Sequence, residues 1–431
     1  MTTITISENT DVKKPAINPI IIIAALFFIF GFVTWLNSVL VPYLKIACDL
    51  SSNVQAYLVV TAFYLPYLVM AVPSAWLLKM LGFKNGMAAG LVIMAIGAVI
   101  FIPAAITRTY ALFLLGLFVQ GSGLAVLQSA SNPFITILGP PESAAKRISI
   151  MGIFNKAAGS LAPIALGAVA LKNIDGLKKT LLTLDAVHKA AELDKLASRV
   201  IVPYILMVVV LIVLAVLIYF VSLPEIDTNH EDKDVAAANA GKTSILNFPH
   251  LILGVIALFL YVGAEVIAGD SIISYGASLN IPLSTAKFFT TCTLVSMIVG
   301  YLIGIFCIPR IITQQKALVV CAVLGFIFTT CALIVHGYYS VFCIALLGLA
   351  NSLMWPAIWP LGLSGLGRFT KIGSSLLVMS IAGAAVFPPL YGFLVDKMSA
   401  QSAYAMLIPI YLFILYFATI GYKKGKHVVA V

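Results

Sequence analysis

Three ionisable residues lie inside long apolar runs of the sequence: Lys156, Glu265 and Asp270. If these runs cross a membrane, each charge costs roughly 2.5–3.5 kcal/mol near the centre, so such groups face a cavity or one another. We therefore expect them to compensate charge or to couple ions, with a purely structural cation as the alternative for Lys156. Asp270 follows Glu265 by about one and a half helical turns and is expected either within the membrane or at its far interface.

Neutral polar side chains also interrupt the apolar runs. Amides offer both a donor and an acceptor, which suits the vicinal hydroxyls of a sugar and suits a metal or an apolar drug poorly. Helix–helix hydrogen bonding is their alternative role. Trp355 and Trp359 lie four residues apart on one helical face, where they either cover the C–H face of a pyranose or pack in the core. The neutral candidates for binding are Asn37, Ser38, Gln128, Asn132, Asn155 and Asn351.

Other classes of function find little support in the sequence. The chain contains no HExxH, GxSxG or P-loop motif, so an enzyme is not expected. Its six cysteines occur singly, without the spacing of a zinc site or a disulfide framework, and no metal or cofactor is expected. The formal charge is +10, but the lysines and arginines are scattered between apolar runs, which argues against a nucleic-acid partner.

The composition requires a lipid environment around these residues. Of 431 residues, 61% are apolar and 10% are charged, whereas soluble proteins carry about 25% charged residues. The continuous apolar runs lack the alternation of a barrel strand, so they predict helices and an all-α integral membrane protein. The twelve predicted spans are 19–43, 54–78, 85–106, 110–138, 147–171, 200–222, 249–275, 285–308, 317–335, 339–366, 371–394 and 403–422.

The distribution of basic residues predicts the orientation of these spans. With both termini in the cytoplasm, fifteen lysines and arginines fall in the termini and loops on that side, while four fall in the opposite short loops. The first apolar run continues past the length of a signal peptide and has no cleavage site, so we expect it to be retained. The prediction is a multi-pass protein of the inner (plasma) membrane.

The chain divides into two similar halves. The polar segment 224–247 separates six spans in residues 1–223 from six spans in residues 248–431, which predicts two six-helix bundles and a cytoplasmic linker. Gln128 precedes Pro133 by five residues, and Asn351 precedes Pro356 by five residues. Internal repeats of this kind are typical of transporters that bind substrate between the repeats, near the middle of the membrane.

Several strings of residues also resemble a known family. They are FFIFGFVTWLNSVLVPYLK, SNPFITILGPPESAAKRISI, FLYVGAEV, NSLMWPAIWPL and GSSLLVMSIAGAAVFPPLYG. Together they resemble the fucose permease and glucose/galactose transporter family of the major facilitator superfamily, over nearly the whole chain. The resemblance implies twelve helices in two bundles, alternating access, and uptake of a hexose or deoxyhexose by a monomer.

Departures from the family pattern leave the coupling mechanism open. The proton-coupled fucose members have Asp where this chain has Ser38 and Glu where it has Gln128, and neither replacement titrates near neutral pH. Lys156 stands where Ser is common. Transport is then either facilitated diffusion with a built-in cation or symport through Glu265 and Lys156, with a proton favoured over sodium. An exporter of other solutes or drugs and a non-transporting sugar sensor are the less favoured alternatives.

Overall fold

The computed structural model describes residues 19–137, 144–221 and 244–425, and within these ranges the chain is all-helical, as predicted. The first half contains α1 (Pro19–Trp35), α2 (Asn37–Ala47), α3 (Asn53–Tyr64), α4 (Pro66–Val69), α5 (Ala71–Thr107), α6 (Tyr110–Ile137), α7 (Ala144–Ala170), α8 (Ile174–Leu181), α9 (Ala186–Ser198) and α10 (Ile201–Phe220). The second contains η2 (Ile245–Asn247), α12 (Pro249–Asp270), α13 (Ile272–Ser278), α14 (Leu283–Ala286), α15 (Phe289–Cys307), α16 (Gln314–Ile334), α17 (Tyr338–Asn351), α18 (Met354–Leu363), η3 (Gly367–Phe369), α19 (Thr370–Met379), η4 (Ser380–Ala382), α20 (Gly383–Lys397), α21 (Ala400–Ala403), η5 (Tyr404–Met406), α22 (Leu407–Thr419) and η6 (Gly421–Lys423).

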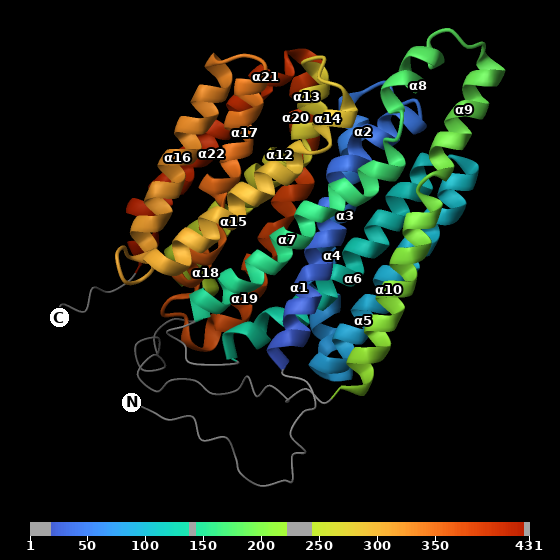
Figure 1. Cartoon of the computed structure of the whole chain (residues 1–431). Coiled ribbons are helices and arrows are strands. Elements are labelled where there is room, and N and C mark those ends of the chain that lie inside the picture. The colour runs from blue at the N-terminus through green and yellow to red at the C-terminus, as the bar shows by residue number, and fades with distance from the viewer. Residues whose placement is uncertain (1–18, 138–143, 222–243, 426–431) are drawn as a thin grey trace.

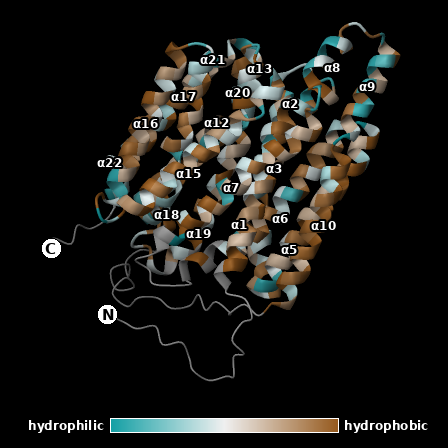
Figure 2. Cartoon of the chain, in the orientation of Figure 1, coloured by the Kyte–Doolittle hydropathy of each residue, from teal (hydrophilic) through white to brown (hydrophobic). Residues whose placement is uncertain are grey.

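The twelve predicted membrane spans are present. Among the described residues, eleven helical stretches are long and apolar enough to cross a membrane, and the shorter stretch Asn53–Val69 supplies the second span. Large apolar side chains stay exposed on the outside of the bundle, for example Val202 at 73% and Phe220 at 79%. Figure 2 shows this apolar surface along the helices, with polar residues gathered at the helix ends and at α8 and α9. An outer surface of this kind suits contact with lipid rather than water.

Several spans are broken, and the first and the seventh are broken at a similar place in their halves. The first span divides where α1 ends at Trp35 and α2 begins at Asn37, and the seventh divides where α12 ends at Asp270 and α13 begins at Ile272. Breaks in membrane helices are tolerated where the freed polar groups are buried in protein rather than exposed to lipid. These breaks therefore place polar residues in the interior of the bundle.

The two halves lie side by side (Figure 1). Their contact is made mainly by α3 against α20 and by α7 against α15. We call the end that carries the start of α1 and the end of α10 the basal face, and the end that carries α8, α13, α14 and α21 the apical face. Most of the predicted linker at 224–247 lies outside the described residues.

Asp396, at the end of α20, joins the halves on the apical face. Its carboxylate accepts hydrogen bonds from the Ser52 hydroxyl at 2.8 Å, from the Asn53 amide side chain at 2.6 Å and from the backbone N–H groups of Asn53 and Val54 at 3.1 Å and 3.4 Å. The first N–H groups of a helix have no partner within the helix. A residue of the second half therefore caps α3 of the first half.

Asp175, in α8, makes the reciprocal contact. Its carboxylate accepts hydrogen bonds from the backbone N–H groups of Leu283 at 3.0 Å and Ser284 at 3.2 Å, at the start of α14, and from the Ser284 hydroxyl at 3.1 Å. Partial burial acts to raise the pKa of Asp175, but these hydrogen bonds outweigh it and the pKa lies below the ordinary value of 3.8. Asp175 therefore stays ionised, and this contact stays intact, at neutral pH.

Replacing Asp396 with alanine should loosen the apical face. The substitution removes the acceptor for the Asn53 N–H, so we expect this amide to exchange hydrogen for deuterium faster. The effect at Val54 should be smaller, because its N–H also donates to the Ser52 hydroxyl at 3.0 Å. Hydrogen–deuterium exchange followed by mass spectrometry measures this directly. Asp194→Ala is the matched control, because Asp194 pairs with Arg108 within the first half. Unchanged exchange at Asn53 and Val54 in the Asp396 variant would show that the cap contributes nothing.

Candidate functional site

The centre of the structure contains a buried ion pair between the two halves. Lys156 on α7 donates a hydrogen bond to Glu265 on α12, with 2.6 Å between Nζ and Oε1. The side chains are 11% and 10% exposed. Because either charge alone would be stranded in a place that excludes most water, each stabilises the other. Two of the three predicted ionisable residues therefore come together in one contact.

Trp35 lies against this pair. The Lys156 Nζ sits 4.7 Å from the centre of the Trp35 ring, which gives the ammonium a second favourable contact. The indole packs on Gly159 of α7 and Gly269 of α12, where a methyl group at either position would overlap it. Only glycine allows this close approach. The ring therefore lies between the two halves, next to the ion pair.

Unsatisfied polar atoms gather around the two helix breaks. Asp270 is 1% exposed and Asn37 is fully buried. Within the described part of the chain, the two carboxylate oxygens of Asp270, the two amide atoms of Asn37 and Nε1 of Trp35 have no hydrogen-bond partner. Asp270 is thus enclosed by protein, and its depth in the membrane stays a prediction. Buried polar groups are nearly always paired, so atoms left free in one region mark a place that receives something else.

Three of the predicted amide and hydroxyl residues already have partners in the protein. The Ser38 hydroxyl donates to the carbonyl of Trp35 at 2.8 Å. Asn155 Nδ2 donates to the carbonyl of Phe27 at 3.4 Å, joining α7 to α1. Asn351 Oδ1 accepts from the Tyr411 hydroxyl at 3.1 Å, while its Nδ2 is buried and has no partner. Asn351 thus makes a hydrogen bond between helices, and its amide N–H group has no partner among the described residues.

The other predicted binding residues lie on α6 and α18. Gln128 is half-buried on α6, which packs against α7. Asn132 lies near the end of α6, but its side chain lies outside the described residues. Trp355 and Trp359 are half-buried and stack on each other, with their ring centres 5.4 Å apart. The helix that carries them, α18, also packs against α7 of the first half.

A layer of tyrosines, absent from the sequence-based prediction, lies on the apical side of the ion pair. The rings of Tyr57 and Tyr391 are 5.6 Å apart, and those of Tyr391 and Tyr404 are 4.9 Å apart. The Tyr404 hydroxyl is 2.7 Å from the hydroxyl of Ser271, the residue after Asp270. Tyrosines are common on helices that face a core, so nothing in their spacing indicates this layer.

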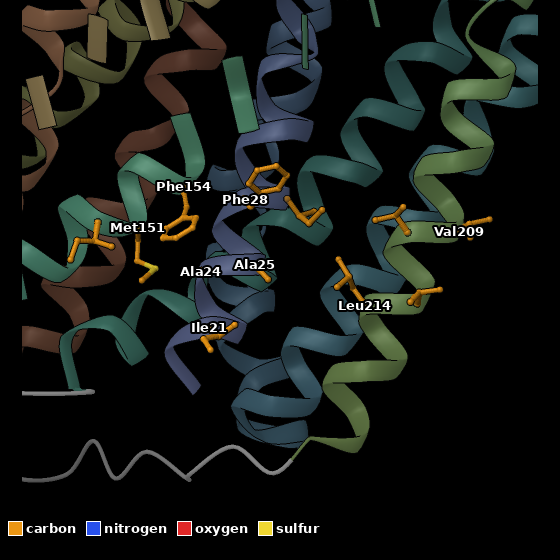
Figure 3. A pocket seen from close by; sticks show the side chains of 12 residues that line it. Ile21, Ala24, Ala25, Phe28, Met151, Phe154, Val209 and Leu214 are labelled. Atoms are coloured by element: carbon orange, nitrogen blue, oxygen red, sulfur yellow. The ribbon is translucent and has the colours of Figure 1, made fainter. Parts of the chain in front are cut away.

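Two pockets differ in chemistry. The first, of about 630 Å³, is lined only by apolar residues of α1, α7 and α10 such as Phe28, Phe154 and Val209 (Figure 3), and it includes none of the predicted binding residues. It is a groove suited to a lipid chain. The second, of about 520 Å³, lies on the apical face between the halves and is lined by both charged and aromatic side chains. Its lining includes Lys45, Lys178, Tyr57, Tyr275 and Tyr391.

Comparison with known proteins agrees with this arrangement. A family description, Major Facilitator Superfamily, matches residues 23–375. The chain belongs to the Major Facilitator Superfamily. It is 34% identical over 406 residues to a glucose/galactose transporter of Brucella abortus biovar 1, covering 93% of each chain. It is 30% identical over 417 residues to the L-fucose-proton symporter of Escherichia coli K12, covering 96% of this chain and 94% of that one.

Solved structures of the superfamily share the fold. The transporter FucP, in the outward conformation, has a TM-score of 0.71 and 30% identity, covering 93% of this chain and 98% of that one. A bacterial homologue of the human lysosomal transporter Spinster, in an inward-facing conformation, has a TM-score of 0.62 at 15% identity and shows the fold alone. This superfamily protein is a multi-pass membrane protein and not an enzyme, as expected from its sequence.

The buried ion pair predicts a large coupling between Lys156 and Glu265. Lys156→Met should lower the free energy of unfolding by about 3–5 kcal/mol, because it strands the Glu265 carboxylate. Adding Glu265→Gln to that variant should recover most of the loss, since no buried charge then remains. Denaturant unfolding of the purified single and double variants measures both effects.

An exposed ion pair of this protein provides the control. Lys189 and Asp49 approach to 2.7 Å, but their side chains are 37% and 64% exposed. Lys189→Met should therefore cost at most about 1 kcal/mol. Simple additivity of the Lys156 and Glu265 substitutions would contradict the coupling.

Proposed function

We propose that this protein is a secondary transporter that moves a monosaccharide, a hexose or deoxyhexose such as glucose, galactose or fucose, by alternating access. The names of its relatives support a sugar as the substrate. The single observation that carries the proposal is the buried polar centre between the halves, where Lys156 and Glu265 meet across the interface. Substrate sites of such transporters lie between the repeats near the middle of the membrane.

The proposed site combines hydrogen-bonding groups with an aromatic surface. Gln128, Asn155 and Asn351 would bind sugar hydroxyls, and the stacked pair Trp355 and Trp359 would cover the apolar face of the ring. Lys156 and Glu265 would set the electrostatic field, and with Asp270 they are the groups available for charge compensation or ion coupling. The complete proposed lining is Asn37, Ser38, Gln128, Asn132, Asn155, Lys156, Glu265, Asn351, Trp355 and Trp359.

The orientation in the membrane follows from the basic residues. We propose that the basal face is cytoplasmic, that the protein lies in the inner membrane as a monomer, and that sugar enters from the apical pocket. The division into a bundle of residues 1–223, a linker of residues 224–247 and a bundle of residues 248–431 belongs to the same proposal. Lipid would fill the apolar groove between α1, α7 and α10.

Counterflow in proteoliposomes tests the substrate. Vesicles that contain the purified protein are loaded with unlabelled D-glucose, D-galactose or L-fucose and diluted into the same sugar in labelled form. A transporter for that sugar produces transient accumulation of label without any ion gradient. Counterflow with none of these sugars would contradict a monosaccharide transporter of the proposed class, and counterflow with lipophilic cations instead would indicate the exporter.

Gln128→Met should weaken sugar binding by about 5- to 150-fold. The methionine keeps the approximate size of the side chain but removes the amide, which leaves a bound hydroxyl without its partner at a cost of about 1–3 kcal/mol. The half-saturating sugar concentration in counterflow measures the loss. Asn173→Gly is the control, because Asn173 precedes α8 in a left-handed conformation (φ 53°) that glycine retains. Equal effects of both substitutions would argue against Gln128 in the site.

A further inference from the structure

The helix breaks bring most of the unpartnered polar atoms of the interior to one region. Among the described residues, eight buried side-chain nitrogen and oxygen atoms lack a hydrogen-bond partner, and five of them belong to Trp35, Asn37 and Asp270. Trp35 and Asn37 flank the break of the first span, and Asp270 ends α12 at the break of the seventh. The contact of Trp35 with Gly269 joins the two breaks. Asp270 is the ionisable member of this group.

The charges around Asp270 do not balance when it is ionised. The ionisable groups whose charge reaches it from neighbouring elements are Lys156 on α7, Glu265 on its own helix, and Tyr57 and Tyr64 on α3. Lys156 and Glu265 neutralise each other at 2.6 Å, and buried tyrosines are neutral. An ionised Asp270 would leave one uncompensated negative charge in the interior, and one proton would make the centre neutral.

The closed apical face keeps water from Asp270. Tyr57, Tyr275 and Tyr391 line the apical pocket, and Tyr404 bonds to Ser271 beside Asp270. Only 1% of Asp270 is exposed. Enclosing an unpaired carboxylate costs far more than enclosing the acid form, which is neutral. The conformation described here therefore favours the protonated form of the Asp270 carboxyl.

We infer that Asp270 is the proton-binding residue of this transporter and that its proton moves with the sugar. In the conformation that opens to the donating compartment, the carboxylate takes a proton from water and forms an O–H bond; closure then encloses a neutral group. Opening to the other compartment breaks that O–H bond, returns the proton to water and restores the carboxylate. The Lys156 and Glu265 pair stays charged throughout, because separating or neutralising one partner would strand the other.

The inference rests on the proposed sugar transport, and one set of vesicles tests both. An inward gradient of one pH unit is a tenfold ratio of proton activity, so coupling of one proton to one sugar supports up to about tenfold accumulation. We expect the wild-type protein to accumulate whichever of D-glucose, D-galactose and L-fucose gives counterflow. Asp270→Asn should abolish this accumulation and remove the pH dependence of counterflow, while some counterflow remains. A protonophore should abolish accumulation by the wild type.

Asp194→Asn is the matched control, since Asp194 has a side chain that is 59% exposed and pairs with Arg108 within the first half. It should accumulate sugar as the wild type does. Wild-type counterflow that no proton gradient converts into accumulation would overturn the proton site and leave the sugar proposal standing, as would accumulation driven by a sodium gradient alone. Accumulation by Asp270→Asn would also overturn it. Absence of counterflow by the wild type would instead contradict the proposed function.

Infrared spectroscopy provides a readout that does not depend on transport. A protonated carboxylic acid has a carbonyl-stretch band that a carboxylate lacks. We expect this band in the wild-type protein at neutral pH and in Asp194→Asn, and its loss in Asp270→Asn. The spectrum tests the assignment of the proton to Asp270 even if Asp270→Asn folds but transports nothing. A band that persists in the variant overturns the assignment, and loss of the band supports it.

Discussion

Burial of charge is the constraint on which this structure depends. Lys156 and Glu265 come from different halves of the chain and meet with about a tenth of each side chain exposed. Neither charge is stable there alone, so the position of each half is tied to that of the other. Trp35 covers the ammonium and needs Gly159 and Gly269 to fit. The ion pair, the Trp35 ring and the two glycines together hold α1, α7 and α12 in contact.

The broken helices follow from the same constraint. A helix that ends inside a membrane frees backbone groups that lipid cannot satisfy, so the breaks after Trp35 and Asp270 are possible only because protein surrounds them. Asn37 and Asp270, beside these breaks, are buried and lack hydrogen-bond partners among the described residues. Polar side chains that the fold leaves free are the ones available to a proton or a substrate.

The sequence predicts the twelve spans and the three interior charges because a charged residue in an apolar run is rare and conspicuous. It allows Lys156 to compensate Glu265, but it leaves open whether the two charges face each other or a cavity. The hydrogen bond between them is known only from the packing of α7 against the second half. The sequence also does not predict that Asp396 caps α3 and that Asp175 caps α14, because these contacts depend on which helix end lies opposite each carboxylate. The partner of Asn351, Tyr411, is equally a result of packing.

The apical and central contacts differ in how easily water replaces them. Asp396 is exposed and Asp175 is half-buried, so water can take over their hydrogen bonds as the halves separate. The Lys156 and Glu265 pair has no such substitute in the interior. Motion between the halves should therefore break the apical caps and preserve the central pair, which acts as a pivot between α7 and α12. Asp270 lies between the two kinds of contact, five residues from Glu265 and next to Ser271 in the tyrosine layer. Opening on the apical side would thus reach Asp270 before it reaches the pair, which is the order that a proton-binding group needs.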